Sequence, residues 1–133
     1  MIEFDSAHRV MKHESKCRNL HGHRYRIELT VVGDLDPLGR VIDFGEMKRL
    51  VGAWVDEQLD HGTLLNANDD DLIELCRQNG WKLYVMDCNP TAENIARDVF
   101  WAAASLLEPA GITVDRVRLF ETPNCWSDYP DGR

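Results

Sequence analysis

The stretch HGHRYRIELTVV, residues 21–32, determines the expected fold more firmly than any other part of the chain. Side chains of a β-strand point alternately to its two faces. One face would carry His21, His23, Tyr25, Ile27, Leu29 and Val31, and the other Arg24, Arg26, Glu28 and Thr30. This period of two predicts a long strand with one face against a core and the other in solvent.

Outward from this strand, short apolar segments alternate with helical patterns. Strands are also expected at residues 2–8, 82–86 and 114–121, with a short returning strand at Val41 and Ile42. Long helices are expected at 44–59 and from Asn89-Pro90-Thr91 to just before Pro109, and a short one at 72–78. Residues 9–20, 33–39 and 66–71 are expected to be loops or turns because they are polar or contain Gly and Pro.

Capping residues indicate where the two long helices start, and the lengths of the connections indicate the fold class. Asp43 is predicted to cap the first long helix with Glu46 completing a capping box, and Asn89 or Thr91 to cap the second. Most connections look too short for crossovers between parallel strands. We therefore expect one α+β domain over residues 1–133, with an antiparallel four-stranded sheet and two long helices on one face.

Composition narrows the class of function. The formal net charge of −8 argues against nucleic-acid binding, and no apolar run approaches the roughly 20 residues that span a membrane. No secretory signal is visible, and the four cysteines contain no C-x-x-C pair, so reduced thiols in the cytoplasm are expected. Against the net charge, five cations cluster near the N-terminus, where they either bind an anion or form a solvated surface: Lys12, Lys16, Arg18, Arg24 and Arg26.

Three histidines point to a metal site. His21 and His23 lie two apart on one strand face, so their Cα atoms stand roughly 6.5–7 Å apart. His8 ends the preceding strand on its apolar side and can supply a third nitrogen if the two strands pair. Three imidazoles leave an open coordination position, which is the pattern of catalytic zinc, although copper, iron or nickel would accept the same ligands.

Alternatives to this site remain open at the level of sequence. His-x-His on a strand is often an exposed polar pair, and His13 is a rival third ligand in a polar loop. Cys17 is flanked by Lys16 and Arg18, and nearby cations favour a reactive thiolate. The same thiol could be a fourth zinc ligand, which would close the site, or a small buried hydrophobe.

The motifs together resemble a known family. Ser6-Ala7-His8, Cys17-x-x-x-His21-Gly22-His23, Leu59-Asp60-His61 and Glu121-Thr122-Pro123 resemble the 6-pyruvoyl tetrahydropterin synthase superfamily, within it most of all the bacterial 6-carboxytetrahydropterin synthases of the 7-deazaguanine (queuosine) route. The segment Asn89–Ile95 looks like the start of the family's second helix, and residues 66–80 look like an insertion. The resemblance implies a T-fold, in which subunits join their sheets into a barrel and assemble into a homohexamer of two trimers.

The same resemblance implies a role for each site residue. Zinc would be held by His8, His21 and His23, and Cys17 would be the proton-abstracting base. Asp60 and His61 would form an acid–base pair that reaches in from a neighbouring subunit. Glu121, helped by Thr91, would anchor the pterin ring. The implied reaction converts 7,8-dihydroneopterin triphosphate to 6-carboxytetrahydropterin, acetaldehyde and triphosphate.

The chemistry is consistent with these residue types. A metal ion that binds the substrate's vicinal hydroxyls acidifies the neighbouring C–H bonds, and a thiolate near neutral pH can take the proton. A carboxylate such as that of Glu121 can pair with the pterin 2-amino and N3–H groups, although a salt bridge to an arginine is the simpler alternative. For Asp60-His61 the simpler alternative is a histidine placed by the helix dipole.

Rival functions follow from the same residues. They are 6-pyruvoyl tetrahydropterin synthase, a non-catalytic zinc- or pterin-binding module, and a metal-free T-fold enzyme acting on purines or pterins.

Overall fold

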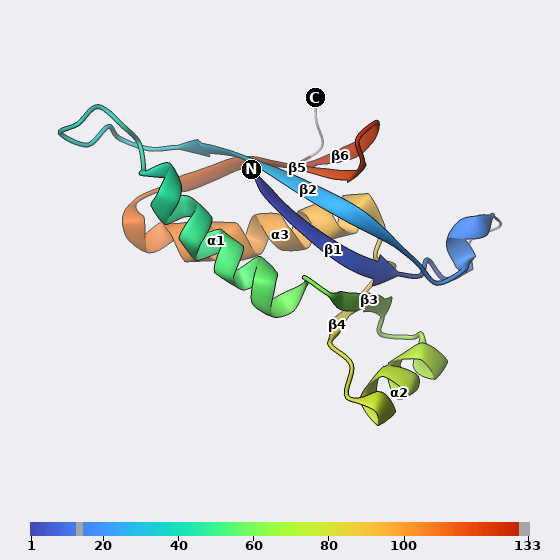
Figure 1. The fold of residues 1–133 in the computed structure, drawn as a ribbon. Coiled ribbons are helices and arrows are strands. Elements are labelled where there is room, and N and C mark those ends of the chain that lie inside the picture. Colours follow the sequence, from blue (N-terminus) through green and yellow to red (C-terminus); the bar gives the residue numbers. More distant parts are fainter. Residues whose placement is uncertain (13–14, 131–133) are drawn as a thin grey trace.

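The computed structural model describes residues 1–12 and 15–130. Strands are β1 (Ile2–His8), β2 (His21–Val32), β3 (Gly62–Asn66), β4 (Leu83–Met86), β5 (Thr113–Thr122) and β6 (Cys125–Tyr129). Helices are α1 (Phe44–Gln58), α2 (Asp70–Asn79) and α3 (Ala92–Leu107), with short 3-10 turns at Lys16–Arg18 and Glu108–Ala110. Figure 1 shows α1 and α3 side by side beneath the sheet, with the 9–20 loop, of which residues 9–12 and 15–20 are described, and the 33–43 loop at opposite ends of β2.

The sheet is mixed, which corrects the expectation of four antiparallel strands. Its six described strands lie in the order β4-β3-β1-β2-β5-β6. Strands β1, β2, β5 and β6 are antiparallel neighbours, whereas β3 runs parallel to both β1 and β4. Three of the connections contain helices: α1 lies between β2 and β3, α2 between β3 and β4, and α3 between β4 and β5. The α+β class and the two long helices on one face are confirmed.

The main core lies between the sheet and the two long helices. Phe4 and Tyr25 stack at its centre, with ring centroids 4.9 Å apart and neither ring more than 1% exposed. The helices contribute Val51, Val55, Ile95, Val99 and Ala103, all at most 1% exposed. Each Å² of apolar surface removed from water contributes about 25 cal/mol to stability. This packing therefore stabilises the β1–β2 pair.

Helix α2 packs on the opposite face at the β3–β4 edge. Successive side chains of a strand point to opposite faces, and Leu64 joins the main core while Leu65 packs with Ile73 and Cys76 of α2. The segment 66–80, expected as an insertion with a loop at 66–71, therefore forms the crossover of a β-α-β unit.

Several local expectations were right and others wrong. Asp43 caps α1 by accepting from Gly45 N at 2.8 Å, but Glu46 pairs with Arg49 instead of completing a capping box. Val41 and Ile42 pack against the core from an irregular segment rather than a strand. Strand β6 was not expected; it pairs with β5 across a turn at residues 123–124.

Within the described residues, no helix combines the length and the apolar character that crossing a bilayer requires.

Candidate metal centre and adjoining cavity

The pairing of β1 with β2 brings three histidines together. His8 lies opposite His21 and Ser6 opposite His23, and residues opposite each other in an antiparallel pair project to the same face. The ring centroids are 4.6 Å apart for His8 and His21, 5.2 Å for His8 and His23, and 4.9 Å for His21 and His23. One nitrogen from each ring lies within 4.8 Å of the other two, so the cluster can hold a metal ion.

Backbone carbonyls orient two of these rings. His8 Nδ1 lies 2.7 Å from Pro90 O, and His21 Nδ1 lies 2.7 Å from Asn19 O. Because a carbonyl oxygen only accepts, both Nδ1 atoms carry a hydrogen, and in the neutral form of each ring the Nε2 atom presents a lone pair. These two Nε2 atoms are 3.1 Å apart. Two nitrogens on one tetrahedral zinc ion stand about 3.3–3.4 Å apart, so the spacing fits a shared ion.

The third ring is half-buried, and its Nε2 atom is buried without a partner. His23 Nε2 has no hydrogen-bond partner, and the nearest carboxylate oxygen, Glu121 Oε1, lies 3.5 Å away. Burial lowers the pKa of His23, and also that of His8, below the ordinary value of 6.5, with the Glu121 carboxylate opposing both shifts. Neutral rings with free lone pairs are the form that binds metal, and a metal would satisfy the unpaired nitrogen. His13, the rival ligand, lies outside the described residues.

A cavity of about 290 Å³ adjoins this cluster. Its lining includes His8, Cys17, Thr91 and Glu121, which come from β1, the 9–20 loop, the start of α3 and the end of β5. Four of the sequence-predicted site residues therefore meet in one cavity.

Cys17 lies in the 3-10 turn Lys16–Arg18 and is half-buried. Its carbonyl accepts from Val10 N at 3.1 Å. Among the described residues, the group close enough to share a metal contains only the three histidines. This geometry favours an open three-histidine site with the thiol beside it rather than a closed four-ligand site.

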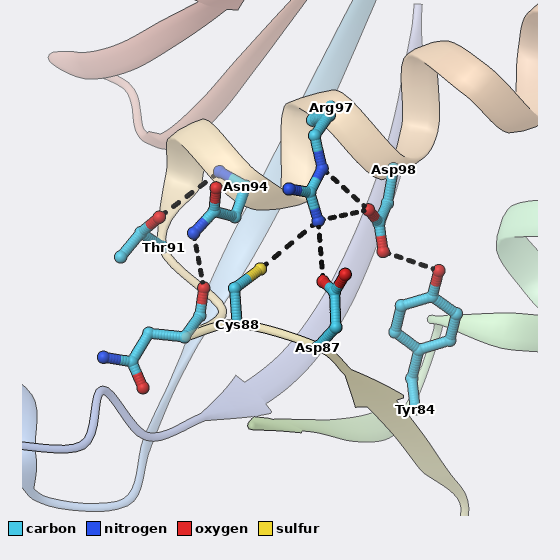
Figure 2. Close-up of polar contacts among 8 residues, drawn as sticks. Tyr84, Asp87, Cys88, Thr91, Asn94, Arg97 and Asp98 are labelled. Carbon is cyan, nitrogen blue, oxygen red and sulfur yellow. Dashed lines mark hydrogen bonds and ion pairs between the residues drawn. The ribbon is translucent and has the colours of Figure 1, made fainter. Parts of the chain in front are cut away.

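Glu121 and Thr91 occupy the expected face. Glu121 projects from the end of β5 toward His23, with Glu121 Oε1 3.5 Å from His23 Nε2, rather than toward an arginine. Thr91, not Asn89, caps α3: Thr91 Oγ1 accepts from Asn94 N at 3.2 Å, as Figure 2 shows.

Asp60 and His61 lie away from this cavity. His61 Nδ1 is 2.8 Å from Asp60 Oδ2, and the His61 side chain is 78% exposed, next to a separate hollow lined by Asp5 and Arg24. The Asp5 backbone N–H and then His61 lower the pKa of the Asp60 carboxyl. His61 also has a positive φ of 59°, a costly conformation for a residue other than glycine that often accompanies function. Within one chain His61 lines a hollow that His23 also lines, whereas Cys17 lines the other cavity.

The cationic cluster is divided between strand β2 and the loop that precedes it. Arg24 pairs with Glu3 and Asp5 on the face away from α1 and α3, and Arg26 lies over the Phe120 ring at 4.1 Å. Lys16 and Arg18 are exposed beside Cys17. Lys16 and Arg18 flank a residue that lines the cavity, so they are placed to meet an anion there.

Sequence reasoning missed the groups that orient the ligands. Pro90 and Asn19 act through backbone carbonyls, which leave no residue-type signal. Asn89 was noted only as a possible helix cap.

Comparison with known proteins agrees with the family resemblance of the sequence motifs. The model of the 6-pyruvoyl tetrahydropterin synthase family matches residues 1–131. The 6-carboxy-5,6,7,8-tetrahydropterin synthase of Rickettsia bellii is 43% identical over 131 residues, covering 94% of this chain and 93% of that protein. The 6-pyruvoyl tetrahydropterin synthase structure from Caenorhabditis elegans superposes with a TM-score of 0.66 at 26% identity, covering 98% of this chain and 91% of that one. An uncharacterized protein from Wolinella succinogenes shares the fold, with a TM-score of 0.79 at 22% identity, 96% of this chain and 93% of the other being covered.

The histidine cluster generates a metal-binding prediction. Protein purified without chelators is expected to contain one zinc ion per chain, and His21→Ala to lose most of it, because two nitrogens alone hold zinc weakly. His61→Ala is the matched control and should keep a full complement, since His61 lies outside the cluster. Elemental analysis of both variants checks this. Equal zinc in the two variants would contradict the assignment.

Proposed function

The chain belongs to the 6-pyruvoyl tetrahydropterin synthase family, and from this premise we propose that it is a zinc-dependent 6-carboxytetrahydropterin synthase. The proposed reaction is lyase chemistry: 7,8-dihydroneopterin triphosphate and water give 6-carboxy-5,6,7,8-tetrahydropterin, acetaldehyde and triphosphate. The product would serve 7-deazaguanine (queuosine) biosynthesis in the cytoplasm. The named activity of the Rickettsia relative supports this choice within the family.

One observation carries the proposal: the three-histidine cluster adjoins the cavity that Cys17 and Glu121 also line. His8, His21 and His23 would hold the zinc ion, and their geometry fits it as described above. When bound, zinc would supply Lewis-acid polarisation of the substrate side-chain hydroxyls.

Cys17 is the proposed base. Its thiolate would take a proton from the substrate side chain, and Lys16 and Arg18 flank it in the chain. The same two cations are the proposed contacts for the triphosphate, because they are exposed beside the cavity.

Glu121 and Thr91 are proposed to hold the pterin ring. The Glu121 carboxylate would accept from the 2-amino and N3–H groups in a bidentate pair. The Thr91 hydroxyl accepts from Asn94 N, so its own hydrogen remains available to a ligand in the cavity.

Asp60 and His61 are proposed to act across a subunit boundary. The place of His61 at a different hollow from Cys17, its exposed imidazole and its positive φ all support a role at a neighbouring copy's site. The proposed assembly is a homohexamer, a dimer of trimers, in which Asp60 orients His61 as an acid–base group.

The first test measures product and metal on the same sample. Wild-type protein given dihydroneopterin triphosphate is expected to release acetaldehyde in proportion to its zinc content. Cys17→Ala should keep its zinc and lose activity by at least about 10²-fold, the usual scale for removing a general base. Cys76→Ala, a buried cysteine in the α2 cluster, is the matched control and should remain active.

Each alternative has its own outcome in this test. Triphosphate release without acetaldehyde would identify the chain as a 6-pyruvoyl tetrahydropterin synthase. Zinc or pterin binding without turnover would identify a binding module. Loss of zinc in Cys17→Ala would make Cys17 a ligand and refute its role as base.

The second test examines whether subunits share a site. Cys17→Ala and His61→Ala homo-oligomers should each be inactive. Hybrids formed from equal amounts of the two should recover about a quarter of wild-type activity, because random pairing leaves that share of sites with both groups intact. Hybrids that form but stay inactive would refute the shared site.

A further inference from the structure

The cavity keeps its shape only if two separate segments that line it hold their relative position. One is the Cys17 loop, residues 9–20, which follows β1. The other is the turn at residues 87–91, between β4 and α3, which supplies Pro90 O to His8 and Thr91 to the cavity. Nothing in the proposed chemistry accounts for how these two segments are held together.

Asn89 links them through its side-chain amide. Asn89 Oδ1 accepts from Met11 N at 3.1 Å, and Asn89 Nδ2 donates to Met11 O at 3.1 Å. One side chain therefore satisfies both backbone groups of a single loop residue, as a neighbouring strand would. Asn66 Nδ2 also donates to Asn89 Oδ1 at 3.0 Å.

The link reaches Cys17 in one step. Val10, next to Met11, donates its N–H to Cys17 O at 3.1 Å, and Val10 is only 8% exposed. The position of Met11 therefore determines the position of Val10 and, through it, the backbone of Cys17.

The turn that carries Asn89 is itself rigidly held. Asn94 Nδ2 donates to Asn89 O at 2.9 Å, and Arg97 Nη2 contacts Asp87 Oδ1 at 3.0 Å and Cys88 Sγ at 3.3 Å. Figure 2 shows Asn94 and Arg97 reaching down from α3 to this turn. Because the helix fixes the turn, the Asn89 amide is a fixed point for the loop.

We propose that Asn89 is a positioning residue that holds the Cys17 thiol at its working distance from the metal centre. The inference rests on the proposed role of Cys17 as base. Asn89 lies next to Pro90, whose carbonyl orients His8, so adjacent positions of one turn fix both the base and a metal ligand.

The experiment compares Asn89→Ala with Asn66→Ala. Asn89→Ala releases Met11 and should lower kcat by about 10- to 100-fold, the cost of a misplacement near 1 Å, with KM and zinc content nearly unchanged. Asn66→Ala removes a hydrogen bond to the same Oδ1 but leaves both Met11 contacts, so its kcat should stay within about twofold of wild type. Equal losses in both variants, or no loss in Asn89→Ala, would overturn the proposal.

A second readout does not depend on turnover. Site-resolved mass spectrometry gives the rate at which iodoacetamide alkylates Cys17, with exposed Cys125 as the internal reference. The Cys17 rate should rise severalfold in Asn89→Ala and stay at the wild-type value in Asn66→Ala. An unchanged Cys17 rate in Asn89→Ala would overturn the positioning role.

Two further measures separate a failure of the positioning role from a folding defect and from a failure of the proposed function. If Asn89→Ala does not fold, Asn89→Asp retains the acceptor for Met11 N and lacks the donor for Met11 O, and it should change both readouts in the same direction. If wild-type protein releases no acetaldehyde, the proposed function fails by itself, while the alkylation rates still decide the positioning role.

Discussion

The antiparallel register between β1 and β2 is the constraint on which the metal centre depends. It places His8 opposite His21 and, two positions along, Ser6 opposite His23. A shift of one residue would turn His8 to the other face of the sheet, because strand side chains alternate. The stacked Phe4 and Tyr25 rings, buried in the same register, stabilise this pairing from the adjoining core. The core and the candidate metal centre therefore depend on a single alignment.

Elements far apart in the chain complete the centre. Backbone carbonyls of Asn19 and Pro90 set the orientation of two rings, and β5 brings Glu121 beside the third. Groups that orient a ligand's distal nitrogen fix its tautomer and raise its basicity. The 9–20 loop is held from two sides, by Asn89 at Met11 and by a forked ion pair between Arg9 and the buried Asp69 at the start of α2. The β3-α2-β4 unit thus supports the loop that carries Cys17.

The period of two in residues 21–32 was enough to predict the central strand and the shared face of His21 and His23. Strand β4 was expected at residues 82–86, whereas β3, which is 5 residues long and directly follows α1, was not, and the parallel pairing of the two has no signal in the residue pattern. Strand β6 contains polar residues whose pairing with β5 depends on the turn between them. The cluster of cations looked continuous in sequence, yet Arg24 pairs with carboxylates of the neighbouring strand β1, whereas Lys16 and Arg18 lie in the 3-10 turn before β2.

X-ray absorption at the zinc edge is the most direct test of an open three-histidine centre, because it reports the ligands themselves. A three-histidine centre is expected to show nitrogen and oxygen ligands at about 2.0–2.1 Å, with imidazole scattering from three histidines and no sulfur. A sulfur atom at about 2.3 Å would contradict it, because Cys17 would then close the coordination position that the substrate requires.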